Sequence, residues 1–224
     1  MQTTTDPSPL LALLNGSLAE LDIPTTAYEM AVGRYHHLGD WLIVRGLGTP
    51  RVYPQGSFKL GTVVRPGVDG EFDIDLVFWR DLARGSITQA ELKAQAGALL
   101  TTYLAECGPA IGNPTIEEKG RCWCLTWADD SLHLDILPVI PDDSDDADDE
   151  GILLTDRDLH RWQYSNPIGY AAWFEGRVAD VIEAERGAQP DSVDPGGPRE
   201  QPRGGRSDAH AGTSSQGSSS RSRL

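Results

Sequence analysis

Apolar residues recur at helical spacing in several stretches of the chain. Residues 8–22 and 25–46 are expected to form two helices separated by Pro24, and residues 87–107 an amphipathic helix. Two further helices are predicted over 155–162 and 169–185. In the second segment the apolar positions that follow this spacing are Tyr28, Val32, Tyr35, Leu38, Leu42 and Val44.

Elsewhere the pattern changes to a period of two, which is typical of strands. Residues 51–57 read as a short strand that runs into a Gly-Ser turn, and residues 72–79 read as a second strand. Residues 121–127 and 132–140 flank the turn 128–131 and predict a β-hairpin. The pattern therefore indicates a chain that contains both helices and strands.

The composition changes sharply near residue 190. From Pro190 onward the chain is rich in Gly, Pro, Ser and Arg and has almost no apolar residues, so it cannot bury enough surface to offset chain entropy. We expect a core domain over residues 1–189 and a disordered low-complexity tail over 190–224. The tail is either native or an out-of-frame or artificial end of a longer protein, and we favour the second explanation.

The charge of the chain makes some classes of function less favourable. The net charge of −15 disfavours strong binding to nucleic acid. Residues 141–150 hold seven acids in ten positions and favour a solvated loop over a calcium site, because the spacing of a calcium-binding loop is missing.

The expected localisation and the expected state of the cysteines follow from features that the sequence lacks. No apolar run reaches the length of a membrane span, and the first residues lack the layout of a signal peptide, so we expect no membrane association and a cytoplasmic protein. The odd set Cys107, Cys122 and Cys124 then favours reduced thiols over a zinc site or disulfides.

Two aspartates interrupt the apolar strand 72–79. Asp73 and Asp75 are two residues apart, so both side chains face one side, while Ile74 and Leu76 face the core. Two carboxylates on one face repel each other unless a cation lies between them, and Mg²⁺ prefers such oxygen ligands. The alternative is a solvated pair of acids on an exposed strand.

Asp135 in the predicted hairpin offers a third carboxylate. It alternates with Leu134 and Ile136, so it faces away from the core, and it approaches Asp73 and Asp75 if the two strands are neighbours. Three carboxylates suit a two-metal site for phosphoryl chemistry. The alternative for Asp135 is an ordinary residue on the hairpin surface. His133 shares its face and is more typical of a packed or surface histidine than of a ligand.

The Gly-Ser turn suits the other end of a nucleotide substrate. Gly56 allows close approach of the backbone, Ser57 offers a hydroxyl and an amide to phosphate oxygens, and Lys59 or Arg65 supplies positive charge. A helical turn after the glycine would aim further amides at the phosphates. Plain turn residues and solvated charges are the alternatives. Together with the aspartates, the turn points to nucleotidyl transfer.

The order of these motifs resembles a known superfamily. "YPQGSFKLGTVVRP", "FDIDLV", "HLDILPVIP" and "TDRDLHRWQYSNPIGYAAWF" are similar to DNA polymerase β-like nucleotidyltransferases, and in particular to the bacterial cyclic GMP-AMP synthase-like enzymes, or CD-NTases. The resemblance covers roughly residues 25–185. It implies an α+β fold with a mixed sheet backed by helices and a long N-terminal spine helix, predicted over residues 25–46.

The resemblance also implies roles for single residues. Asp73, Asp75 and Asp135 match the metal-binding carboxylates, which would hold Mg²⁺ or Mn²⁺, and Gly56 and Ser57 match the triphosphate-binding turn, with Gln55 beside it. The implied substrates are nucleoside triphosphates (ATP, GTP or others), joined into a cyclic oligonucleotide signal in anti-phage defence. Regulatory partner proteins are a further expectation.

One departure keeps other functions open. Family members continue into a helical C-terminal half that closes the nucleotide pocket, whereas this chain holds only its beginning before the low-complexity tail. The alternatives are another polymerase β-like nucleotidyltransferase, which modifies a protein, a drug or an RNA, and a truncated remnant without turnover.

Overall fold

The fold is described from a computed structural model that covers Leu13, residues 16–17, 21–46, 49–65, 71–144 and 150–188. The side chains of residue 182 and of residues 184–188 are outside the description. Most of the helix predicted over 8–22, part of the acidic segment 141–150 and the whole tail 190–224 lie outside the described residues. Those predictions therefore stay predictions.

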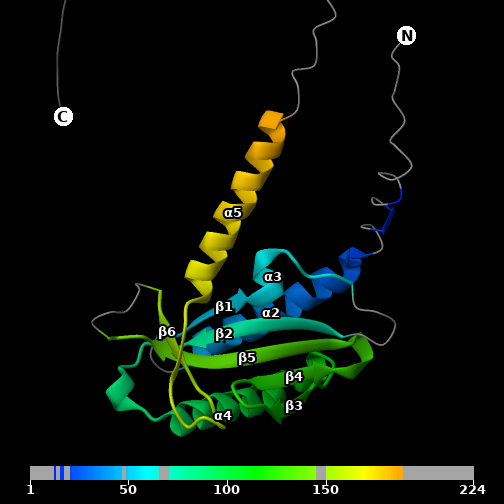
Figure 1. The fold of residues 1–224 in the computed structure, drawn as a ribbon. Helices are drawn as coiled ribbons and strands as arrows, with labels where there is room; N and C mark the ends of the chain where they lie inside the picture. Colours follow the sequence, from blue (N-terminus) through cyan, green and yellow to red (C-terminus); the bar gives the residue numbers. More distant parts are fainter. Residues whose placement is uncertain are drawn as a thin grey trace, which may run out of the picture.

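A seven-stranded mixed sheet forms the body of the domain (Figure 1). Its main path runs β1-β2-β5-β4-β3, with β6 paired to β5 and β7 paired to β6. Only the β2–β5 pair is parallel among these described strands, and the other five pairs are antiparallel. The strands are β1 (Arg51–Gln55), β2 (Phe72–Trp79), β3 (Thr115–Glu118), β4 (Trp123–Trp127), β5 (Leu132–Pro141), β6 (Ile152–Leu154) and β7 (Gln163–Ser165).

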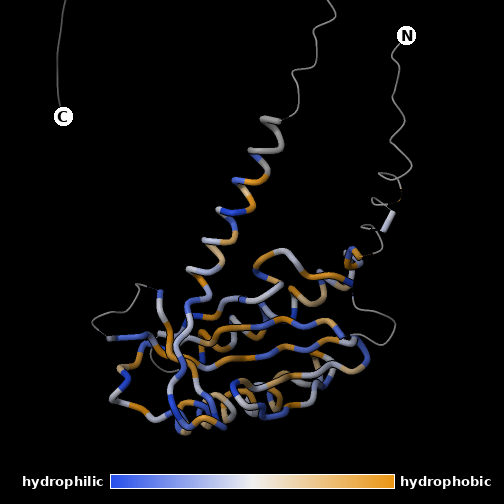
Figure 2. The backbone as a smooth tube through the Cα atoms, in the orientation of Figure 1, coloured by the Kyte–Doolittle hydropathy of each residue, from blue (hydrophilic) through white to orange (hydrophobic). Residues whose placement is uncertain are grey.

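Helices back one face of this sheet. α2 (Thr25–Arg45) and α4 (Gln89–Cys107) pack on the even-numbered side chains of the two central strands, where Ile74, Leu76 and Leu134 are fully buried. The hydropathy of the chain follows this arrangement, with hydrophobic positions along β2 and β5 in the middle of the sheet (Figure 2). The odd-numbered side chains of β2 and β5 therefore face the side that these helices leave uncovered.

Two further helices, α3 and α5, complete the described fold. α3 (Gly56–Leu60) follows β1 directly, and α5 (Pro167–Ala188) contacts α3 near its start and then projects away from the sheet (Figure 1). α4 begins two residues later than its apolar pattern indicates. Thr88 caps it, and Thr88 and Glu91 exchange the two hydrogen bonds of a capping box.

The helix predicted over residues 155–162 is wrong. Thr155 and Asp156 are buried in an irregular segment, and a series of turns follows. The Asp156 carboxylate accepts hydrogen bonds from the backbone amides of Asp158 (3.0 Å) and Leu159 (2.9 Å), as an N-cap does, but the left-handed backbone of His160 (φ 51°) ends the helix after a single turn. Strands β3, β6 and β7 were also not expected from the pattern.

The predicted fold class is confirmed. The α+β architecture, the mixed sheet backed by helices and the long N-terminal helix are all present, and the predicted hairpin is β4–β5. Among the described helices, none combines the length and the apolar character needed to cross a membrane.

Candidate active site

The two aspartates of β2 stand on the sheet face opposite the helices. Ile74 and Leu76 are fully buried, whereas Asp73 is exposed and Asp75 is half-buried. Side chains alternate along a strand, so burial of the even positions in the core leaves both carboxylates on the other face. This is the arrangement expected from the sequence.

Strand pairing brings the third carboxylate to the same place. β2 and β5 run parallel, Asp75 is the direct partner of Asp135, and Asp73 is the partner of His133. Neighbouring strands lie about 4.8 Å apart, so partners in register project side by side on one face. This pairing confirms the prediction that Asp135 lies close to Asp73 and Asp75.

The carboxylates disturb one another electrostatically. Burial raises the pKa of Asp75 above its ordinary value, and the charges of Asp135 and Asp73 raise it further. Burial likewise raises the pKa of Asp73, partly offset by the nearby His133 imidazole. A bound cation would relieve both the repulsion and the cost of burial, so the site is chemically suited to one.

The donor set fits a hard divalent cation. Three carboxylates supply the oxygen ligands that Mg²⁺ and Mn²⁺ prefer. Within the described ranges, no group of three or more His, Cys, Asp and Glu side chains is already arranged to hold a metal ion. Metal binding by Asp73, Asp75 and Asp135 would therefore require rotation of at least one side chain.

A thiol contacts the third carboxylate. Cys122 Sγ donates to Asp135 Oδ2 at 3.3 Å, and Cys124 is the strand partner of Asp135 on β4. Burial, followed by the charge of Asp135, raises the pKa of Cys122 to about 12, so this group remains a protonated donor. The sequence indicated reduced thiols over a zinc site for these cysteines, and this contact was not expected from it.

The Gly-Ser turn lies against the central aspartate. β1 pairs antiparallel with β2, so Gln55 is the partner of Asp75 and Gly56 follows immediately. Gly56 has φ +63°, and a Cβ atom there would stand 2.4 Å from Asp75 Oδ2. Glycine suits this position, because another residue would strain the backbone and its Cβ would force the Asp75 carboxylate or the turn to move. Ser57 is exposed at the start of α3, the helical turn expected after the glycine.

Lys59 lies farther along the same helix and is already paired. Its Nζ lies 3.2 Å from Glu175 Oε1 of α5, and both side chains are largely exposed. An exposed ion pair of this kind is weak and exchanges readily with other partners. Lys59 is therefore near the turn but is directed toward α5.

A small cavity of about 280 Å³ lies beside the aspartates, lined mainly by residues of the sheet. Gln55, Asp75 and Asp135 line it, whereas Asp73, Gly56, Ser57 and Lys59 do not. The other lining residues are Arg121, Cys122, Leu137, Leu154 and Ser165.

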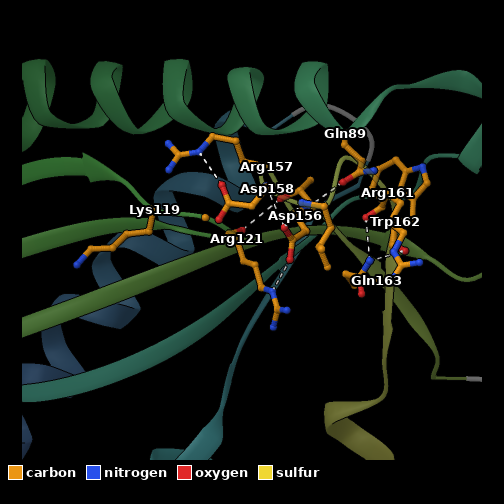
Figure 3. Close-up of polar contacts among 12 residues, drawn as sticks. Gln89, Lys119, Arg121, Asp156, Arg157, Asp158, Arg161, Trp162 and Gln163 are labelled. Atoms are coloured by element: carbon orange, nitrogen blue, oxygen red, sulfur yellow. Dashed lines mark hydrogen bonds and ion pairs between the residues drawn. The ribbon is translucent and has the colours of Figure 1, made fainter.

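Arg121 also belongs to this site, although the sequence did not predict it. It precedes β4, and its Nε donates to Asp156 Oδ2 at 2.8 Å, so a buried carboxylate holds one side of the guanidinium (Figure 3). Its side chain is 59% exposed and lines the cavity of the aspartates. Alternation along the hairpin would place Arg121 on the face opposite Cys122, so the sequence pattern carried no signal for it.

Comparisons with known proteins agree with this geometry. Residues 50–140 match the family described as cyclic GMP-AMP synthase DncV-like, nucleotidyltransferase domain. A c-di-GMP synthase from Roseivirga ehrenbergii is 32% identical over 129 residues, which is 55% of this chain and 30% of that protein.

Solved structures show the same fold. The CD-NTase CdnG from Bradyrhizobium diazoefficiens, in complex with GTP, superposes with a TM-score of 0.59 at 24% identity, over 74% of this chain and 45% of that one. CdnC from E. coli MS115-1, in a complex with HORMA-deltaN, gives 0.51 at 15% identity over 80% and 51%. The chain thus spans about a third to a half of the length of these relatives.

Proposed function

From the premise that residues 50–140 form a DncV-like nucleotidyltransferase domain, we propose that this chain serves metal-dependent nucleotidyl transfer. The reaction joins nucleoside triphosphates into a cyclic oligonucleotide. The single observation that carries the proposal is the direct pairing of Asp75 with Asp135, next to the Gln55–Gly56 turn. An exposed pair of surface acids would need neither a third carboxylate in register nor a glycine against it.

Each proposed role uses a group near that pairing. Asp73, Asp75 and Asp135 would hold Mg²⁺ or Mn²⁺, which supplies charge stabilisation for attack of a hydroxyl on the α phosphorus. Gln55, Gly56, Ser57 and Lys59 would bind the triphosphate through side chains and backbone amides. We add Arg121, whose guanidinium brings positive charge to a cavity that two carboxylates also line.

Guanine nucleotides are the proposed substrates, with ATP as a second candidate. The relative from R. ehrenbergii is named a c-di-GMP synthase, and CdnG was solved in complex with GTP. The strongly negative net charge of −15 makes transfer RNA a poor acceptor. Modification of a protein or a drug by the same chemistry remains the competing function, which the product would reveal.

A defence role and a partner follow from the same premise. We propose that the product acts as a cytoplasmic signal against phage and that a regulatory protein binds the enzyme, since CdnC was solved in complex with HORMA-deltaN. Mixing the chain with candidate regulators encoded beside it, and following complex formation by size-exclusion chromatography, tests the partner.

The central experiment is a synthesis assay. The chain is incubated with radiolabelled GTP and ATP, with Mg²⁺ or with EDTA, and the products are treated with phosphatase. A small product that resists phosphatase has no free terminal phosphate and supports cyclisation, whereas label attached to a macromolecule supports the competing function.

Matched variants test the metal assignment. Asp73→Asn with Asp75→Asn should abolish product, and Asp129→Asn, an exposed acid in the turn between β4 and β5, should leave it unchanged. Equal activity of the double variant and the wild type would overturn the assignment of these carboxylates.

A further inference from the structure

A second and larger cavity, of about 770 Å³, lies on the other side of the sheet edge. It opens between α4, the start of β4 and the turn segment after β6, and it shares no lining residue with the cavity of the aspartates. Trp123 lines it, while its neighbour Cys122 lines the other cavity, as expected from alternation along one strand. Its volume lies within the range of small-molecule sites.

The apolar wall comes from one face of α4 that carries small side chains. Ala90, Ala94, Gly97 and Ala98 follow helical spacing on that face, while Leu92 and Leu100 pack on the sheet. The Trp123 indole lies against Gly97, where a Cβ atom would stand 2.3 Å from Cζ2. Larger residues on this face would fill the space, so its emptiness is a consequence of the sequence.

The indole is held firmly in place. Trp123 Nε1 donates to the Lys93 carbonyl at 2.9 Å. Lys93 is itself 5% exposed, and its Nζ donates to the carbonyls of Lys119 and Gly120 (2.6 Å for Gly120). Because this wall is already ordered, binding of a ligand costs little conformational entropy of the protein.

Charged side chains of both signs line the cavity, with Glu118 and Asp156 as acids and Lys93 and Arg157 as bases. Arg157 and His160 line it, and the Arg157 side chain is 52% exposed. Its ion pairs are long, at 3.9 Å to Glu118 and 3.6 Å to Asp158, which leaves the guanidinium available to another anion (Figure 3). His160 also lines an adjoining hollow together with Arg84 and Arg161. Glu118 already faces Lys93 at 3.4 Å and Asp156 faces Arg121 at 2.8 Å, so Arg157 is the charged lining residue with the longest ion pairs.

We propose that this cavity binds a small molecule with a flat apolar or aromatic body and one anionic group. The body packs between the small face of α4 and Trp123, and the carboxylate, sulfonate or phosphate group meets Arg157. Binding here does not depend on the proposed function, because none of the carboxylates of the candidate active site takes part.

The dye 1-anilinonaphthalene-8-sulfonate has this chemistry and serves as the probe. Fluorescence and calorimetric titration of the full chain should give saturable binding at one site. Arg157→Ala should weaken binding by about fivefold, whereas Arg177→Ala, an exposed arginine on α5, should change it by less than about twofold. Ala94→Trp should abolish binding by filling the cavity, and Ala179→Trp on the exposed face of α5 should not.

Two results would overturn the proposal. One is equal dye affinity in Arg157→Ala and Arg177→Ala, and the other is unchanged binding in a folded Ala94→Trp protein. If circular dichroism shows that Ala94→Trp does not fold, the pair of arginine variants decides, since both side chains lie at the surface.

Discussion

Replacement of Gly56 by alanine would test the contact between the turn and the catalytic strand most directly. The residue has φ +63°, and its new Cβ would stand 2.4 Å from Asp75 Oδ2, about 1 Å inside ordinary contact distance. The clash forces the turn or the carboxylate to move. A shift of about 1 Å at a reacting centre lowers rates by roughly a hundredfold.

Gly61 offers a matched control. It has φ +65°, close to the value at Gly56, yet nothing lies within 4 Å of the position of its Cβ. Alanine at either site adopts a left-handed backbone conformation, which lowers the free energy of unfolding by about 1–2 kcal/mol. Only Gly56→Ala adds the displacement of Asp75, so the difference between the two variants isolates that contact.

Two measurements separate stability from function. Urea unfolding should show that both variants lose about 1–2 kcal/mol, with the larger loss in Gly56→Ala. Calorimetric titration with GTP in the presence of Mg²⁺ should show affinity weakened by roughly tenfold or more in Gly56→Ala and nearly unchanged in Gly61→Ala. Equal GTP affinities in the two variants would refute the reasoning that the turn and Asp75 act together.

Three further expectations concern charge and capping. Thr88→Ala should lower the free energy of unfolding by about 1 kcal/mol through loss of the capping box, and Thr102→Ala, exposed in the middle of the same helix, should change it by less than about 0.5 kcal/mol; equal losses in urea would contradict the cap. Asp156 has a lowered pKa, mainly from its arginine partner, so its stabilisation is present above the unfolded-state pKa of about 4 and is lost as pH falls through the lower folded value. The Tm of wild type should therefore fall more between about pH 5 and about pH 3 than that of Asp156→Asn, and parallel curves would contradict this. In EDTA, Asp75→Asn should raise Tm by removing a repelled, half-buried charge, whereas an unchanged or lower Tm would show that the repulsion is not significant.

The helices and central strands were predictable because their patterns are local. α2, α4 and the β4–β5 hairpin follow from apolar spacing, and α4 differs from its pattern only at its cap. The short strands β3, β6 and β7 have three or four residues each, too few for a period to be visible. The segment 155–162 has helical spacing, but the left-handed backbone of His160 (φ 51°) ends the helical turn that Asp156 caps.

The sequence by itself determined which side of β2 the two aspartates occupy and which glycine and serine accompany them, because alternation and turn chemistry are properties of a few adjacent residues. Only the tertiary structure decided that Asp135 is the direct partner of Asp75, that Cys122 contacts it and that Arg121 reaches the same cavity. The pairing of Asp75 with Asp135 depends on strand order and register between segments about 60 residues apart. Many long-range contacts together set that register, and no single stretch of the chain records it.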